Sequence, residues 1–469
     1  MRLAYFSPLN PIRSGISDYS LELLPQLAAH ADITLVVDGY TPTDPELRMF
    51  RVVDDKTFRA DEFDLALYQL GNSPAHAYIY RRALREPGVI ALHELTLHHL
   101  VAWLTLNHGD TTGYIAAMRD AYGDAGARLA EREARGLEAL NRFDYPLSER
   151  VIRGARGIIA HSRYVADAVK RITRAVPVAQ IPHELPNIPL VAQQDARARL
   201  NLPSDALLIG AFGNLGPAKR TPILCDAFRA TRQNFPNARL LLVGAASPNF
   251  DAAGLLDLFE LHDAAQWVDH VPFDAFHLYM AAMDVCVNLR YPTAGETSGA
   301  TLRAMALAKP VIVSRVGWFA ELPEDVVAQI EVDDREVAQL TATLTRLLDD
   351  TTLRAAMGAN ARRYVLEHCA AQKAARYYAE FLQATREGRA TSKVYGRMDN
   401  VGRVTVRQAK AETRAVEMTQ PVGAAPSIAA PIDWRDEVIR AYVELGLDAD
   451  DALLEKVARA VSELGLSEK

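Results

Sequence analysis

Short hydrophobic runs alternate with longer amphipathic stretches along most of the chain. Patterns typical of buried strands occur in the first part at RLAYFS, DITLVVD, FDLALYQL, GVIALHE, ARGIIAHS and VPVAQIPH. They start again at ALLIGAFG and continue through ARLLLVGA, WVDHVPF, DVCVNLR and PVIVSR. Helical patterns lie between most of these runs, and strands that alternate with helices predict a parallel sheet covered on both faces. We therefore expect two successive doubly wound α/β units.

Changes in composition suggest where the domains end. We expect an N-terminal Rossmann-like domain at 1–188 and a second one at 198–366, because three prolines flank a polar stretch in ELPNIPLVAQQDARARLNLPS. A long amphipathic helix is predicted at 367–388. Residues 389–431 have the composition of a flexible linker, and 432–469 show the periodicity of a small helical segment. Ligands of doubly wound sheets bind beyond the carboxyl ends of the strands, so the active site is expected in the cleft between the domains.

The overall composition narrows the classes of function. A chain of 469 residues suits two domains, and a hydrophobic content of 49% is ordinary for a globular protein. The formal net charge of −7 disfavours broad nucleic-acid binding, which usually needs a basic face. Cys225, Cys286 and Cys369 form no CxxC pair or Cys/His cluster, so neither a zinc site nor a disulfide framework is expected. The apolar runs are too short for a signal-peptide core or a membrane span, and we expect a cytoplasmic protein.

The strongest candidate site follows the strand that ends near Arg290. The sequence RYPTAGETSGATLRAMALAKP gives a Gly-containing loop and then a helix that starts around 298–301, where free backbone N–H groups attract phosphate. Glu296 lies at the mouth of this loop, where its carboxylate could accept hydrogen bonds from sugar hydroxyls. Arg303 comes seven residues later, within about 20° of the same helical face. The alternative is a capped helix with a solvated charge pair.

Two loops of the predicted sheets add basic and imidazole groups. Lys219 and Arg220 close the Gly/Pro loop FGNLGPAKR and could neutralise a diphosphate without a metal, although such a loop is otherwise a solvated turn. His93 ends a strand and could hydrogen-bond a sugar. Glu94 and His98 have a helical spacing that a metal site could use, but a single nearby carboxylate and no HExxH pattern disfavour this.

A further loop, NPIRSGISDYS, joins the first predicted strand to the first helix. Its Gly15 permits close approach of the backbone to a ligand. A lone glycine loop is a weak signal without the other pieces.

The order of these pieces resembles family 4 of the glycosyltransferases, which are retaining enzymes with the GT-B fold. The resemblance covers residues 1–385. It implies that Glu296 holds hydroxyls of the transferred sugar, that Lys219 meets the diphosphate and that His93 lies beside the transferred sugar. It also implies that the amides of 298–301 face sugar and phosphate, and that the strand end at 271–273 holds the nucleobase, largely through backbone groups. The donor-binding residues that it implies, directly or as neighbours of the motifs, are Gly15, Gly213, Asn214, Arg220, Val271, Phe273, Thr297, Ser298, Gly299, Ala300, Thr301 and Arg303.

Two positions depart from the family pattern. Asn214 stands where the family usually has an Arg after the glycine of the phosphate loop. Arg303 stands where a second Glu usually grips the ribose, with the spacing one residue shorter. Arg303 or Arg220 could restore the lost positive charge. The sequence motif GETSG…LRA is similar to that of a bacterial subgroup of the family.

The resemblance implies transfer of a sugar from a nucleotide diphosphate with retention, without a metal, a cofactor or a protein general base. The expected partners are a nucleotide sugar and a carbohydrate or lipid-linked acceptor, with no nucleic acid. Helices are also predicted between 113 and 150. Peripheral membrane contact through the helical stretch after His99, whose Trp103 and Leu/Val content favour a place in the core, and a partner for the C-terminal helices remain open. The alternatives are a catalytically inactive nucleotide-sugar-binding scaffold, a nucleotide-sugar epimerase and a phosphorylase on the same fold.

Overall fold

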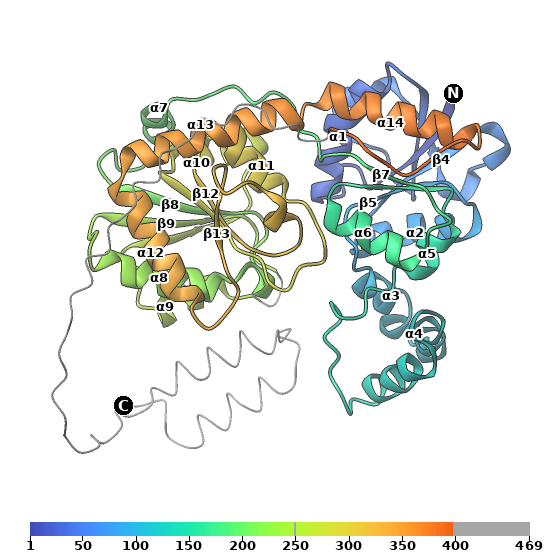
Figure 1. Cartoon of the computed structure of the whole chain (residues 1–469), viewed down its shortest axis with the longest axis horizontal. Helices are drawn as coiled ribbons and strands as arrows, with labels where there is room; N and C mark the ends of the chain where they lie inside the picture. The colour runs from blue at the N-terminus through green and yellow to red at the C-terminus, as the bar shows by residue number, and fades with distance from the viewer. Residues whose placement is uncertain (248–249, 397–469) are drawn as a thin grey trace.

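Two parallel β-sheets, each with helices on both faces, organise the chain (Figure 1). This computed structural model describes residues 1–247 and 250–396. The segment predicted at 432–469 and the larger part of the linker predicted at 389–431 lie outside the described residues. None of the helices in the described ranges combines the length and apolarity needed to cross a membrane.

The N-terminal sheet has eight strands in the order β14-β7-β6-β5-β4-β1-β2-β3, and every pairing is parallel. Its inner strands are buried along almost their whole length, as the continuous apolar runs predict, whereas the two edge strands are exposed or half-buried. The strands are β1 (Arg2–Phe6), β2 (Asp32–Val37), β3 (Arg51–Asp54), β4 (Leu65–Leu70), β5 (Val89–Leu92), β6 (Gly157–Ala160) and β7 (Val178–Gln180). The covering helices are α1 (Gly15–Leu27), α2 (Ala77–Arg85), α5 (Glu149–Gly154) and α6 (Arg163–Ile172).

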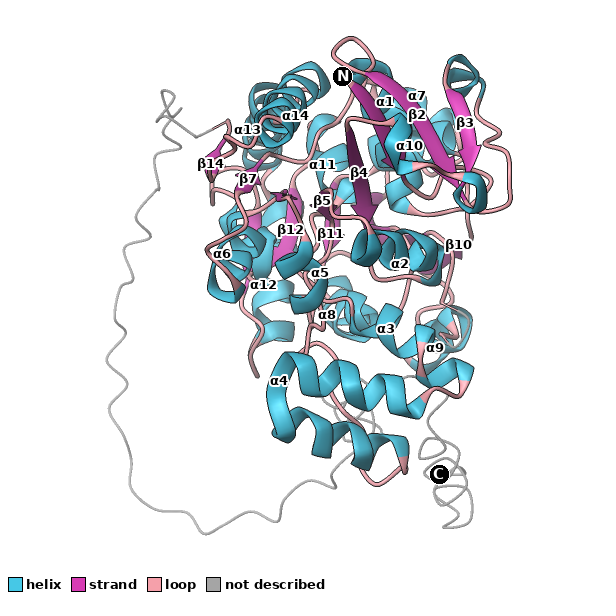
Figure 2. Ribbon diagram, turned by 90° about the vertical axis from the view of Figure 1, so that its right-hand side faces the viewer, coloured by secondary structure: helices cyan, strands magenta, loops and turns pink. Residues whose placement is uncertain are grey.

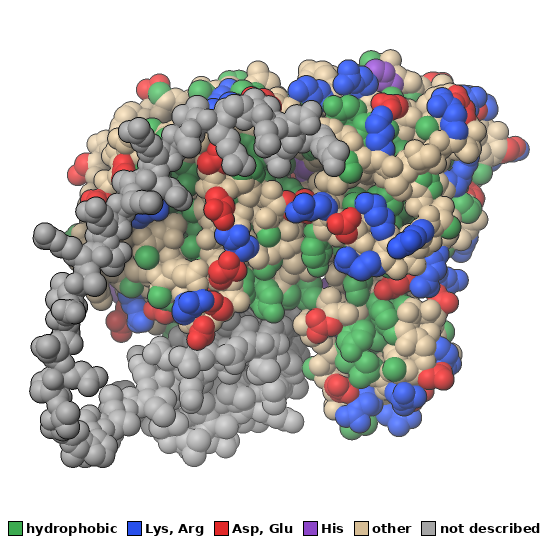
Figure 3. Space-filling view, in the orientation of Figure 1, with side chains coloured by type: hydrophobic (Ala, Val, Ile, Leu, Met, Phe, Trp, Pro, Cys, Tyr) green, Lys and Arg blue, Asp and Glu red, His purple; other side chains and the backbone are tan. Residues whose placement is uncertain are grey.

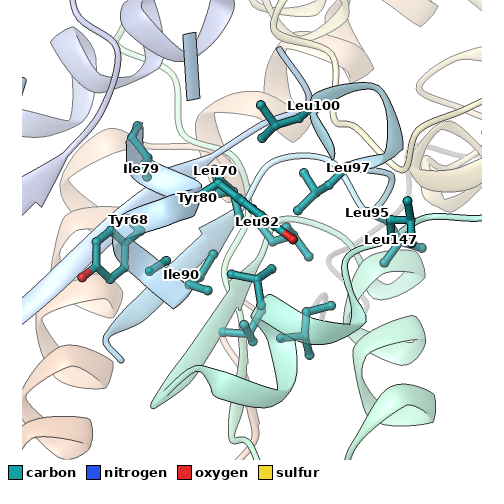
Figure 4. Packing of buried hydrophobic residues seen from close by; sticks show 14 of the residues in the cluster. Tyr68, Leu70, Ile79, Tyr80, Ile90, Leu92, Leu95, Leu97, Leu100 and Leu147 are labelled. Carbon is teal, nitrogen blue, oxygen red and sulfur yellow. The ribbon is translucent and has the colours of Figure 1, made fainter. Parts of the chain in front are cut away.

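One core of this domain lies between the sheet and the helices α2 and α5. Side chains of β4 and β5 meet those of α2 and of the segment after β5, as Figure 4 shows for Leu70, Ile79 and Leu92. Leu97 and Leu147 belong to the same core, and the amide of Leu97 donates to the carbonyl of Pro146 at 2.7 Å. The core therefore extends beyond the sheet edge towards an inserted pair of helices.

The inserted helices α3 (His98–Leu104) and α4 (Thr111–Ala134) project from the N-terminal domain (Figures 1 and 2). Gly123 has a φ of 66°, which breaks α4 into two antiparallel halves. The return segment 135–148 is not helical, unlike our prediction. Hydrophobic side chains gather on this projection (Figure 3), and Leu137 is 63% exposed.

The second sheet has the strand order β10-β9-β8-β11-β12-β13, again all parallel. Its strands are β8 (Leu207–Phe212), β9 (Ala238–Val243), β10 (Ala265–Val268), β11 (Val285–Asn288), β12 (Val311–Ser314) and β13 (Ala328–Ile330). Its helices are α7 (Gln193–Arg199), α8 (Thr221–Arg232), α9 (Ala252–Leu258), α10 (Phe273–Ala282), α11 (Gly299–Ala306), α12 (Glu336–Asp349) and α13 (Thr351–His368). The predicted strand WVDHVPF is shorter in the structure, because the strand stops at Val268 and Phe273 begins a helix.

The chain crosses between the domains twice, and the two crossings lie side by side. The amide of Leu185 donates to the carbonyl of Cys369 at 2.7 Å. After the second crossing, α14 (Ala371–Arg386) packs on α1 of the N-terminal domain, where the hydroxyls of Tyr19 and Tyr378 are 2.7 Å apart. The first residues of the predicted linker are ordered, because β14 (Lys393–Val394) pairs with β7.

Candidate active site

The loop between β11 and α11 holds Glu296 in a fixed position. Arg290 Nε lies 2.7 Å from Glu296 Oε1, and Thr293 Oγ1 donates to Glu296 Oε2 at 2.9 Å. The side chains of Arg290 and Glu296 are 19% and 16% exposed, so the pair retains contact with solvent. The predicted sugar-binding carboxylate is therefore preorganised by two neighbours from its own loop.

The start of α11 is capped, as the alternative interpretation of this segment expected. Ser298 Oγ accepts a hydrogen bond from the Thr301 amide at 3.2 Å. Asn288, at the end of β11, donates from Nδ2 to Ser298 Oγ and to Thr301 Oγ1, both at 2.8 Å. Asn288 thus joins the strand end to the helix start that the resemblance assigns to sugar and phosphate. Thr297, Gly299 and Ala300 are half-buried around this turn.

Lys219 reaches the same place from the loop after β8. Its Nζ donates to the carbonyl of Phe212 and to Asn288 Oδ1, both at 3.3 Å. Burial lowers the pKa of Lys219 well below its usual value, and the charge of Arg290 lowers it further, while Glu296 raises it. Two cations that repel each other beside a helix N-terminus favour a multiply charged anion, which would restore the ammonium form.

The backbone around Lys219 explains the glycine of this loop. Gly213 has a φ of 97°, in the left-handed region that favours glycine, and a Cβ there would lie 3.5 Å from Lys219 Nζ. The next residue, Asn214, is exposed.

The guanidinium of Arg220 is bound on another helix than the groups around Lys219. Its guanidinium pairs with Glu336 on α12, and both side chains are buried. Arg220 also lies over the ring of Tyr291, 5.6 Å from its centroid. These contacts tie α8 to α12, and the structure does not bring Arg220 to the diphosphate position that we considered for it.

Arg303 also has partners that the sequence did not suggest. Its Nη2 lies 2.5 Å from Glu22 Oε1 on α1, and its guanidinium stacks over the ring of Phe273, 4.6 Å from the centroid. Our prediction that Arg303 and Glu296 share a helical face is wrong, because α11 begins at Gly299, after Glu296.

The segment predicted to hold the nucleobase lies beside Arg303. Phe273 is 39% exposed at the start of α10, and Val271 is half-buried just before it. An exposed ring next to an arginine offers a stacking surface for a base.

His93 extends the site from the N-terminal domain. Its Nε2 lies 2.8 Å from Gln69 Oε1, which fits the tautomer that carries a proton on Nε2. Its ring packs edge-on against Tyr19, with His161 at a centroid distance of 4.9 Å. Burial and the neighbouring His161 and His183 lower the pKa of His93 well below its usual value. His93 is therefore a neutral hydrogen-bonding group rather than a cation.

Gly15 is the first residue of α1. Ser14 caps this helix by accepting from the amides of Ile16 and Ser17. Gly15 is exposed, and a Cβ there would meet no atom within 4 Å. The loop leaves open space at a helix N-terminus.

The two domains touch directly at this site. The carbonyl of Ala294 accepts from the amides of Leu95 at 2.7 Å and Thr96 at 3.0 Å. Gly295 has a φ of 87°, and a Cβ there would lie 2.9 Å from the Cβ of Leu95. This contact brings the loop that carries Glu296 against the strand end that carries His93.

The described residues contain no group of three or more His, Cys, Asp and Glu side chains placed to hold a metal ion. His98, which we weighed as a metal ligand with Glu94, contacts the carbonyl of Tyr145 at 2.6 Å through Nδ1 and the hydroxyl of Tyr114 at 2.7 Å through Nε2. One ring nitrogen thus holds α4 and the other holds the return segment 135–148.

Arg290 and Asn288 were not predicted as site residues from the sequence, and Glu94 was considered only as a metal ligand. Asn288 is the last residue of β11, and Arg290 follows in the loop that leads to the Gly-Glu-Thr-Ser-Gly stretch. Their polarity at and just after a strand end was the available signal. Burial and the charge of Glu296 raise the pKa of Glu94 to about 7, which marks a carboxyl in an unusual environment.

Comparisons with known sequences find similarity to glycosyltransferases. Residues 206–350 match the model of the family described as Glycosyl transferases group 1. A D-inositol 3-phosphate glycosyltransferase of Salinispora arenicola is 34% identical over 186 residues, 37% of this chain and 40% of that protein. The corresponding protein of Stackebrandtia nassauensis is 30% identical over the same length and the same shares. The chain thus spans 40% of the length of these curated relatives.

Solved structures define the fold. A sucrose-phosphate synthase from Thermosynechococcus elongatus matches with a TM-score of 0.61 at 17% identity, covering 82% of this chain and 99% of its own. HepE of Anabaena, in complex with UDP and glucose, matches with a TM-score of 0.58 at 17% identity, covering 82% and 100%. The described residues therefore have the two-domain GT-B fold of glycosyltransferases, as predicted.

Proposed function

We propose that this protein is a retaining glycosyltransferase that moves a hexose from a nucleotide-diphosphate sugar to a hydroxyl of a carbohydrate or lipid-linked acceptor. The observation that carries the proposal is the meeting of Lys219, Arg290 and Glu296 at the start of α11. This arrangement offers two cations and a helix N-terminus to a diphosphate and a carboxylate to the adjacent sugar. The family match of residues 206–350 supports the same assignment.

In the proposed reaction, negative charge develops on the diphosphate leaving group, next to Lys219 and Arg290. The bond between the anomeric carbon and the diphosphate breaks, and its electron pair leaves with the nucleotide. Lys219, Arg290 and the amides of α11 stabilise this developing charge, so the proposed reaction needs no metal or cofactor. The acceptor oxygen forms the new bond on the same face. Following the family resemblance, we assign its proton to the departing phosphate and assign no protein base.

The donor proposed first is a UDP-hexose. The HepE structures, which share only the fold, contain UDP or UDP-glucose. Val271 and Phe273 would meet the base, while His93 would face the transferred sugar. The acceptor belongs to bacterial polysaccharide or glycoconjugate synthesis in this proposal. The exposed apolar side chains on the α3–α4 projection would then rest on the cytoplasmic face of a membrane.

The test is transfer itself. The purified protein is incubated with UDP-glucose and other nucleotide sugars and a panel of glycan and lipid-linked acceptors, and UDP release and product configuration are measured by NMR. We expect an α-linked product from an α-linked donor and a strongly reduced rate for Glu296→Gln. A β-linked product would contradict retention. Binding of a nucleotide sugar without turnover on any acceptor would favour the scaffold alternative, which the changes at Asn214 and Arg303 also suggest.

A further inference from the structure

We propose that Glu94 is a second sugar-binding carboxylate of this active site, which accepts hydrogen bonds from hydroxyls of the transferred hexose next to those held by Glu296. The inference rests on the proposed function, since it names how the N-terminal domain takes part in holding the same sugar.

The backbone geometry brings the two carboxylates together. The amides of Leu95 and Thr96 donate to the carbonyl of Ala294, and the Cα of Gly295 lies so close to Leu95 that a Cβ would fall 2.9 Å from its Cβ. Glu94 and Glu296 each adjoin this contact, one from each domain. The charge of Glu296 acts on Glu94 directly. The segment that carries Glu94 therefore lies, from the other domain, against the loop that carries Glu296.

The two carboxylates differ in their present partners. Glu296 is held by Arg290 and Thr293. Glu94 is half-buried and receives a hydrogen bond from the backbone amide of Asn72. A carboxylate oxygen can accept several hydrogen bonds, so a neutral amide leaves capacity for further donors.

Neutral hydroxyls suit this place better than another charged group. The charges that act on Glu94 are those of Glu296 and Arg290, from the loop between β11 and α11. His93 precedes Glu94 in the chain, His99 of α3 lies 2.9 Å from the side chain of Asn72, and Arg290 and Glu296 act in turn on Lys219. Burial and Glu296 raise the pKa of Glu94 to about 7, while Arg290 lowers it. Neighbouring hydroxyls of one pyranose could donate to both carboxylates without adding charge, and they would stabilise the ionised form of Glu94.

Comparing a nucleotide sugar with its nucleotide isolates the sugar contact. UDP-glucose and UDP are titrated by calorimetry into the wild-type protein, Glu94→Gln and the control Glu46→Gln, which removes an exposed carboxylate of the same domain. We expect Glu94→Gln to weaken the binding of UDP-glucose about tenfold or more, which is the cost of one charge-assisted hydrogen bond. The affinity for UDP should be unchanged. The affinity of the wild type for UDP-glucose should also rise from pH 6 to pH 8 relative to that of Glu94→Gln.

The outcomes separate this inference from the proposed function. If the wild type binds UDP-glucose and Glu94→Gln binds it equally well, the inference is overturned. If Glu94→Gln loses affinity for UDP and for UDP-glucose equally, the inference is also overturned, because Glu94 would then have a structural role. If the wild type binds neither UDP-glucose nor any other nucleotide sugar, the proposed function itself fails.

Discussion

Arg303 on α11 forms an ion pair with Glu22 on α1, so the helix that follows the loop of Glu296 is bound to the other domain. The two side chains are only 7% and 10% exposed. Burial raises the pKa of Glu22, and the charge of Arg303 opposes that shift. Figure 1 shows α11 on the side of its domain that faces α1.

Breaking this pair should open the protein. Removal of one partner of a buried ion pair costs about 3–5 kcal/mol while the other charge stays buried. In Glu22→Ala, separation of the domains would return Arg303 to water and avoid that cost. We expect a larger radius of gyration by small-angle scattering for Glu22→Ala than for the wild type or the exposed control Glu46→Ala. Identical scattering for all three would show that the pair does not hold the domains together.

Loss of the lysine charge should slow turnover without unfolding the protein. For Lys219→Met we expect kcat to fall by about 10²–10³-fold, the effect typical of removing one group that stabilises charge in a transition state. The unfolding midpoint should stay near that of the wild type. Lys219 is half-buried, and burial disfavours its charged form, so removal of the ammonium group costs the folded state little. Steady-state kinetics and thermal unfolding give both quantities. The exposed Lys56→Met is the matched control, and an equal kcat for the two variants would remove Lys219 from the proposed mechanism.

The buried pair of Arg220 and Glu336 should matter for stability. We expect Glu336→Ala to lose about 3–5 kcal/mol of unfolding free energy, because it leaves Arg220 buried and unpaired. The double variant Arg220→Met, Glu336→Leu should recover most of that loss. Urea unfolding measures both. If instead the double variant is stable but no longer binds UDP, Arg220 has the diphosphate role that the sequence allowed.

The raised pKa of Glu94 gives stability a pH dependence with a definite sign. Its carboxyl titrates near 7 in the folded protein and near 4.5 in the unfolded chain, so folding takes up a proton between these values. The contribution is fully present below about pH 4.5 and is lost as the pH rises through 7. Relative to Glu94→Gln, the wild type should therefore lose stability from pH 5 to pH 8. A constant difference between the two melting temperatures over this range would contradict the shift.

The sequence was sufficient for the fold because its signals are local. Continuous apolar runs such as LAYF in β1 and LLLV in β9 predict buried parallel strands wherever they occur. The edge strand β3, with the half-polar sequence RVVD, and the three-residue β13 carry too little periodicity to be recognised. The return of β14 to the N-terminal sheet depends on tertiary pairing with β7 and has no local signal.

The same limit explains the outcome for the site. Lys219, Glu296 and Ser298 follow strand ends or start a helix, and the structure brings them together with Asn288. The partner of Arg303 could not be predicted, because Glu22 is 281 residues away in the sequence. Arg220 was predicted near the diphosphate because it lies in the same loop as Lys219, but its guanidinium pairs with Glu336 on α12. The sequence of the loop does not show this distant partner.

In the proposed function, the two GT-B domains bind a nucleotide sugar between them. The most direct measurement is thermal unfolding of the full chain against a panel of nucleotides and nucleotide sugars, with and without EDTA. A ligand that binds only the folded state at one hundred times its Kd stabilises it by about 2.7 kcal/mol. We predict a rise in Tm with one nucleotide sugar that EDTA does not change and that Lys219→Met reduces. An unchanged Tm for every nucleotide sugar, with or without a divalent metal, would contradict the account.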